Sequence, residues 1–126
     1  MSTVIRPELV KTNPLYISKH RYYELKHFCL QYPEWKEKCR YLRTSSLIKP
    51  GEVSRDDSWI VYKTNMDLID KCLEQFEDWL RPFIFKAVTL GISYTTLKTL
   101  YNIPCCKETF YDAYRKFFYI LDAERN

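Results

Sequence analysis

Apolar residues along much of the chain recur every three or four positions, which is the period of one buried helix face. From Tyr22 this spacing predicts a first helix, and Ser18 suits its N-cap. Pro33 is placed to open a second helix that runs to about Leu42. A third, central helix is predicted from the most regular stripe in the chain. The members of that stripe are Met66, Ile69, Leu73, Phe76 and Leu80.

Three further helix-patterned segments follow within residues 82–123, and two breaks separate them. At the first break, Gly91 suits the left-handed position after a helix and Ser93 suits the cap of the next one. At the second break, Pro104 cannot continue a helix but can open one. The segment between them, residues 94–101, is too short to be a stable helix alone in water. A short helix, a turn and a longer aromatic helix outline a helix-turn-helix.

Two stretches lack the helical period. Residues 1–15 predict an N-terminal arm, and residues 44–57, which contain a Pro-Gly turn signal, predict a loop. Only two glycines occur, so the chain has little provision for tight hairpins or phosphate-cradling loops. A length of 126 residues predicts one domain. We therefore expect a single all-α domain over residues 1–126, with about five to six helices and a helix-turn-helix-like unit at 82–123.

The net charge of +4 is distributed unevenly along the chain. Residues 1–51 hold ten Lys/Arg against four Asp/Glu, whereas residues 52–81 hold four against eight. The basic first section is suited to contact phosphate, and the acidic middle would repel it.

Composition and motifs exclude several classes of protein. The five cysteines are an odd number, no secretory leader pattern precedes them, and no apolar run approaches the ~20 residues of a membrane span. These features predict reduced thiols, a cytoplasmic location and no membrane partner. Neither the cysteines nor the two histidines have zinc-ligand spacing, and no nucleotide-binding, hydrolase or metalloprotease motif occurs. The sequence therefore predicts no metal, no cofactor and no enzymatic activity.

The second helix of the helix-turn-helix outline carries candidate DNA contacts on its exposed side. Lys107 and Arg115 suit phosphate or guanine, Tyr111 suits a thymine methyl group, and Glu108 can accept from a cytosine amino group. Basic residues of the first helix can add phosphate contacts. The full set of candidate DNA-binding residues is Lys107, Glu108, Tyr111, Arg115, Lys116, Arg21 and Lys26.

Two segments carry a resemblance to known proteins. The stretches YISKHRYYELKHFCLQYPEWKEK (16–38) and GISYTTLKTLYNIPCCKETFYDAYRKFFYIL (91–121) resemble a widespread group of small proteins from phages and prophages of Firmicutes. The run CKETFY is similar to the turn of ArpU/RinA-like phage late-transcription regulators, which are related to sigma-factor region 4. The resemblance implies that Cys106 stands at the cap position. It also implies that Lys107, Glu108 and Tyr111 are exposed recognition residues.

Three functions follow from these observations. The first is a phage-type transcriptional regulator that binds double-stranded DNA through the helix-turn-helix, as one chain or as a homodimer. The second is an anti-defence protein of the anti-CRISPR kind, which inhibits a host nucleoprotein or defence protein because an acidic helix face can imitate nucleic acid. The residues of that face are Asp67, Asp70, Glu74, Glu77 and Asp78. The third is a structural or packaging component that only oligomerises.

Overall fold

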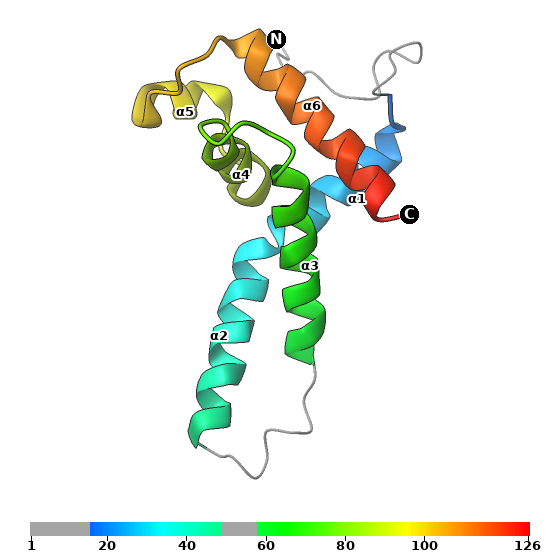
Figure 1. Cartoon of the computed structure of the whole chain (residues 1–126), viewed down its shortest axis with the longest axis vertical. Helices are drawn as coiled ribbons and strands as arrows, with labels where there is room; N and C mark the ends of the chain where they lie inside the picture. Colours follow the sequence, from blue (N-terminus) through cyan, green and yellow to red (C-terminus); the bar gives the residue numbers. More distant parts are fainter. Residues whose placement is uncertain (1–15, 49–57) are drawn as a thin grey trace.

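The computed structural model describes residues 16–48 and 58–126, with side chains over 16–42 and 59–126 (Figure 1). These residues form helices and no strand, which confirms the all-α prediction. None of the helices in these two segments is long and apolar enough to cross a membrane. The helices are α1 (Lys19–Leu30), α2 (Tyr32–Ile48), α3 (Ser58–Leu73), α4 (Arg81–Leu90), α5 (Tyr94–Tyr101) and α6 (Lys107–Glu124).

The first helix begins where the sequence predicts. The side chain of Ser18 accepts a hydrogen bond from the backbone N–H of Arg21, which satisfies one of the free donors at the start of α1. Of the apolar residues whose spacing predicts this helix, Tyr22, Leu25, Phe28 and Cys29 are buried on α1. Tyr32, which has the same spacing, is half-buried and begins α2 instead. The predicted arm at 1–15 lies outside the described residues.

The second helix is longer than predicted. It begins at Tyr32 and continues to Ile48, so the loop predicted for 44–57 is wrong over residues 44–48. Serine and threonine lower helix propensity only slightly, and they do not end a helix by themselves. A strong stop signal comes later, because Pro50 disfavours a helical conformation at the residue before it. The rest of the predicted loop, residues 49–57, lies outside the described part of the chain.

The third helix is shorter than predicted, because α3 ends at Leu73 and not at Leu80. Residues 74–80 form turns, in which Phe76 N–H donates to the Leu73 carbonyl at 3.1 Å. The Arg81 guanidinium donates to the carbonyls of Phe76 and Glu74, at 2.8 and 2.9 Å, and so stabilises this non-helical path. Phe76 and Leu80 are nevertheless buried. The spacing of these two residues therefore predicts their burial correctly, but it predicts wrongly that they lie on the same helix as Leu73.

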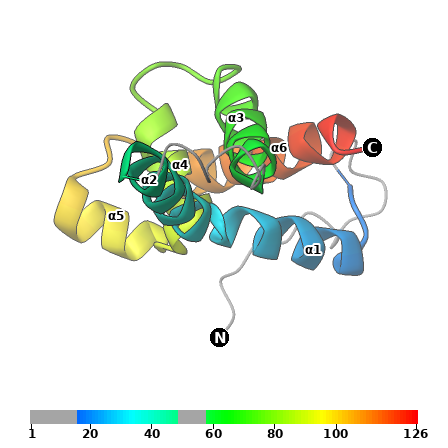
Figure 2. The same ribbon diagram turned by 90° about the horizontal axis from the view of Figure 1, so that it is seen from below.

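The buried side chains form one apolar cluster to which α1 to α6 each contribute, α2 through Trp35. Figure 1 shows α2 and α3 side by side as a pair that projects from the other helices. Figures 1 and 2 both place α5 at one edge of the molecule and the C-terminal end of α6 toward the opposite edge. The start of α6 is therefore held at the α5 edge, away from the end that contacts α1.

Candidate nucleic-acid interface

The helix-turn-helix outline corresponds to α5, residues 102–106 and α6, which we call the recognition unit. Its first helix has the boundaries predicted from the sequence. Gly91 after α4 has φ 70°, in the left-handed region, and the Ser93 side chain accepts from the Thr96 N–H at 3.3 Å. Asn102 ends α5 with φ 52°, a conformation that asparagine tolerates better than most residues. Each end of α5 is therefore fixed by a local signal.

The turn of the recognition unit has five residues and is tied to α5 at three points. Ile103 is fully buried, and its N–H donates to the Leu97 carbonyl at 3.3 Å. Lys98 Nζ donates to the Ile103 carbonyl at 3.4 Å. The Tyr94 hydroxyl donates to the Cys105 carbonyl at 2.6 Å. The turn is thus longer than the usual three or four residues but is held by two side chains and one backbone carbonyl of α5.

The last helix of the unit begins at Lys107, and Cys106 occupies its N-cap. Pro104 lies in the turn and does not open the helix. The Cys106 thiol lies 3.2 Å from the Thr109 hydroxyl, and this hydrogen bond lowers the pKa of Cys106. Phe110 is fully buried on the first turns of α6, and its ring centroid is 5.7 Å from that of Tyr94. The start of α6 is therefore packed directly onto the start of α5.

Three of the predicted DNA contacts lie together on the first two turns of α6. Lys107 is half-buried and Glu108 is exposed. The Tyr111 ring is half-buried against Phe110 and Tyr114, with centroid distances of 5.0 and 5.8 Å. This packing restricts the side-chain conformations that are open to Tyr111.

The other two candidates on α6 have partners within the chain. Arg115 is ion-paired with Asp112, and its side chain is only 15% exposed. Lys116 is exposed, and its Nζ lies 5.9 Å from the centre of the Phe76 ring, close enough for a cation–π contact. Arg115 is therefore poorly available to a phosphate, whereas Lys116 is exposed but lies on the side of α6 that faces Phe76.

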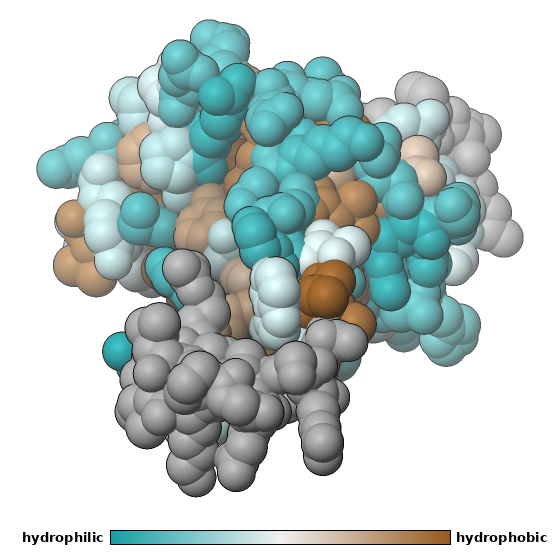
Figure 3. Space-filling model, turned by 60° about the horizontal axis from the view of Figure 1, so that its bottom comes forward, coloured by the Kyte–Doolittle hydropathy of each residue, from teal (hydrophilic) through white to brown (hydrophobic). Residues whose placement is uncertain are grey.

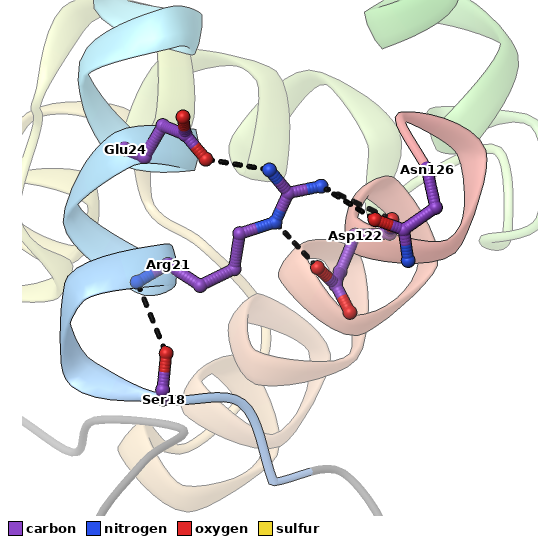
Figure 4. Close-up of polar contacts among 5 residues, drawn as sticks. All are labelled: Ser18, Arg21, Glu24, Asp122 and Asn126. Carbon is purple, nitrogen blue, oxygen red and sulfur yellow. Dashed lines mark hydrogen bonds and ion pairs between the residues drawn. The ribbon is translucent and has the colours of Figure 1, made fainter.

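Arg21 belongs to a polar cluster at the opposite end of α6 (Figure 4). Its Nε donates to Asp122 Oδ1 at 2.6 Å, its Nη1 to Glu24 Oε1 at 2.5 Å and its Nη2 to Asn126 Oδ1 at 3.2 Å. The hydrogen bonds to Asp122 and Glu24 raise the pKa of Arg21. Asp122 follows Lys107 by fifteen residues, which is about 22 Å along a helix. The structure therefore separates Arg21 from the candidates at the start of α6.

The remaining basic candidate, Lys26, lies on α1 one turn beyond Tyr22. Its Nζ is 6.0 Å from the centre of the Tyr23 ring, at the limit of a cation–π contact. Nothing in the described contacts joins Lys26 to α5 or α6.

The acidic helix face predicted for the alternative function is not one face. Because α3 ends at Leu73, Asp67 and Asp70 lie on the helix, whereas Glu74, Glu77 and Asp78 lie in the following turns. The prediction of a continuous acidic helix over these residues is therefore wrong.

Most of these carboxylates also have partners within the chain. Asp67 pairs with Lys63 at 3.2 Å, and Asp78 pairs with Arg81 at 2.8 Å. Asp70 accepts from the Tyr32 hydroxyl at 3.2 Å, and burial raises its pKa. In addition, Glu77 accepts from the indole N–H of Trp79 at 3.1 Å. These contacts reduce the negative field that an inhibitor imitating nucleic acid would need.

Sequence reasoning missed part of the surface at the α5 edge. Lys98 is exposed on α5 beside the turn, and Leu100 and Tyr101 are exposed at the end of the same helix. Figure 3 shows hydrophobic residues next to hydrophilic ones at the edge of the molecule on the α5 side. The sequence contained a signal for this surface. Lys98 lies four residues before the turn, on the last turn of the predicted helix 94–101, where a basic side chain is common. Cationic and apolar groups are therefore adjacent at the edge formed by α5.

The charges of the C-terminal helices are sorted between their two ends. Residues 82–121 hold five Lys/Arg against two Asp/Glu, a balance of +3. The two acidic residues that follow are paired at the opposite end of α6, Asp122 with Arg21 and Glu124 with Lys71 at 3.0 Å. Within the recognition unit itself the charges balance, because four Lys/Arg stand against four Asp/Glu. A small positive excess remains only at the α5 side, where neither Asp122 nor Glu124 lies. No cluster of potential metal ligands occurs among the described residues.

Comparisons with protein-family models, with curated protein sequences and with solved structures found no match to this chain.

Proposed function

We propose that this chain is a phage-type transcriptional regulator that binds double-stranded DNA through the recognition unit. The observation that carries the proposal is the placement of the start of α6. The helix begins at a turn that is tied to α5, on an edge of the molecule, and residues 82–121 have a charge balance of +3. In helix-turn-helix proteins the first turns of the second helix contact base edges in the major groove.

Four side chains at this edge, Lys98, Lys107, Glu108 and Tyr111, have a role in duplex binding under this proposal. Lys98 and Lys107 neutralise phosphates on either side of the turn, and the first backbone N–H groups of α6 are oriented to bind an anion. Tyr111 contacts a thymine methyl group, and Glu108 accepts from a cytosine amino group. In this arrangement Glu108 disfavours sequences that lack a cytosine opposite it, since its carboxylate is then unpaired.

The salt dependence of duplex binding tests this proposal. The logarithm of the binding constant should fall linearly with the logarithm of salt concentration, because each neutralised phosphate releases counterions. Lys98→Ala and Lys107→Ala should each reduce the steepness of that line by about 0.9. Lys36→Ala, which removes an exposed lysine of the projecting α2–α3 pair, should leave it unchanged. Absence of duplex binding at low salt would refute the proposal.

A further inference from the structure

The turn of the recognition unit determines how firmly the start of α6 is held. It has five residues, and a longer connection leaves the start of the second helix more freedom than the usual three or four residues do. Base recognition requires side chains to be held close to their productive geometry. Some contact must therefore restrict the end of the turn, where α6 begins.

Tyr94 makes the contact that is nearest to the start of α6. It is the first residue of α5, and its hydroxyl donates to the Cys105 carbonyl at 2.6 Å, across eleven residues of sequence. Cys105 immediately precedes the N-cap residue Cys106, whose own carbonyl accepts from the Phe110 N–H at 3.1 Å. The hydroxyl of Tyr94 is therefore bonded to the peptide that leads directly into α6.

The Tyr94 ring restricts the same region from a second side. Its centroid is 5.7 Å from that of Phe110, which is fully buried on α6. The other two ties of the turn, from Leu97 and Lys98, both end at Ile103, three residues before the N-cap. Among the contacts described for the turn, those of Tyr94 thus reach furthest toward α6.

We infer that Tyr94 is a positioning residue of the recognition unit: it orients the start of α6, and thereby sequence recognition, through its hydrogen bond to Cys105 and not by touching DNA. This inference rests on the proposed function. Duplex binding has two contributions: phosphate contacts supply affinity for any duplex, whereas base contacts supply the preference for one sequence. Loosening the start of α6 should reduce the second and spare the first.

The variant Tyr94→Phe tests the inference, because it removes the hydroxyl and keeps the ring. The unchanged protein is first used to select duplexes from a random library. Affinities of both proteins for a selected duplex and for unselected duplexes are then measured at a temperature where circular dichroism shows both to be folded. We expect Tyr94→Phe to bind the selected duplex about tenfold more weakly, as when one base contact is lost, and unselected duplexes equally well. Tyr119→Phe, the same change at an exposed position of α6, should alter neither affinity.

The other outcomes separate the two claims. Unchanged affinity of Tyr94→Phe for the selected duplex overturns the positioning role. An equal loss for selected and unselected duplexes also overturns it, because that result indicates direct contact of the hydroxyl with phosphate. If the unchanged protein enriches no sequence, the proposed sequence-specific function fails, and the inference fails with it.

Discussion

Gly91 ends α4 and Asn102 ends α5, each in the left-handed backbone conformation, and the two positions differ in which substitutions they tolerate. A Cβ atom built on Gly91 would lie 3.6 Å from Leu30 Cδ2, an ordinary contact, so space does not require glycine there. Its φ of 70° does, because an L-residue with a side chain is strained in this region. Asn102 has φ 52° and already carries that strain.

Substitutions at these two positions should therefore differ in their effect on the free energy of unfolding. Gly91→Ala should lower the free energy of unfolding by about 1 kcal/mol, whereas Asn102→Gly should leave it unchanged or raise it by a few tenths. Urea unfolding followed by circular dichroism measures both. Equal effects of the two substitutions would contradict the assigned conformations.

The cysteines should differ strongly in their reactivity. Cys106 is exposed, and its hydrogen bond with Thr109 lowers the pKa of its thiol, so more of it is thiolate at a given pH. Burial raises the pKa of Cys72 to about 11 and that of Cys29 further still. With iodoacetamide near neutral pH, Cys106 should be alkylated first and Cys29 only on unfolding. Peptide mass spectrometry over time identifies the order, and rapid labelling of Cys29 in the folded protein would contradict it.

At the scale of elements, α6 is joined to α1 by a pair of residues 101 positions apart. The Arg21 and Asp122 side chains are 24% and 26% exposed, so their hydrogen bond of 2.6 Å is partly shielded from water (Figure 4). A double-mutant cycle with Arg21→Ala and Asp122→Ala should give a coupling energy of about 1 kcal/mol. The Arg40–Glu37 pair, 74% and 66% exposed, serves as the control and should give a smaller coupling energy, because water screens it more fully. Equal coupling in the two pairs would show that the α1–α6 contact contributes nothing specific.

The elements also show which features a sequence can predict. Helix ends set by one residue and its neighbours were predicted correctly, as at Ser18, Gly91 and Ser93. The end of α3 was not, because turns bury Phe76 and Leu80 as well as a helix would. The Arg81 guanidinium stabilises those turns because it donates hydrogen bonds to the carbonyls of Phe76 and Glu74. Apolar spacing in the sequence does not reveal these contacts.

In the candidate site, too, locally determined features are predictable from the sequence and tertiary contacts are not. Lys107, Glu108 and Tyr111 share the start of one helix, so their proximity follows from local spacing. The partners of Arg21 and Arg115 depend on tertiary packing and on side-chain conformation, which spacing alone does not specify. A basic residue in a sequence is thus a candidate phosphate contact only until the structure shows which carboxylate it meets.

At the scale of the whole molecule, the two ends of α6 have different neighbours. The C-terminal end of α6 is tied to α1 and α3 through Asp122 and Glu124, while its N-terminal end lies on the α5 side of the molecule. The α2–α3 pair projects elsewhere from the common core. If the recognition unit binds DNA, contact should be limited to the α5 side.

Nuclear magnetic resonance titration of the protein with a duplex at low salt tests this claim most directly. The account predicts that amide resonances of residues 94–112 shift progressively with added duplex, while those of α2 and α3 remain in place. Titration with a polyanion of no defined helical geometry, such as heparin, provides the control for attraction by charge alone. Shifts confined to the α2–α3 pair, or no shifts with duplex, would contradict the account.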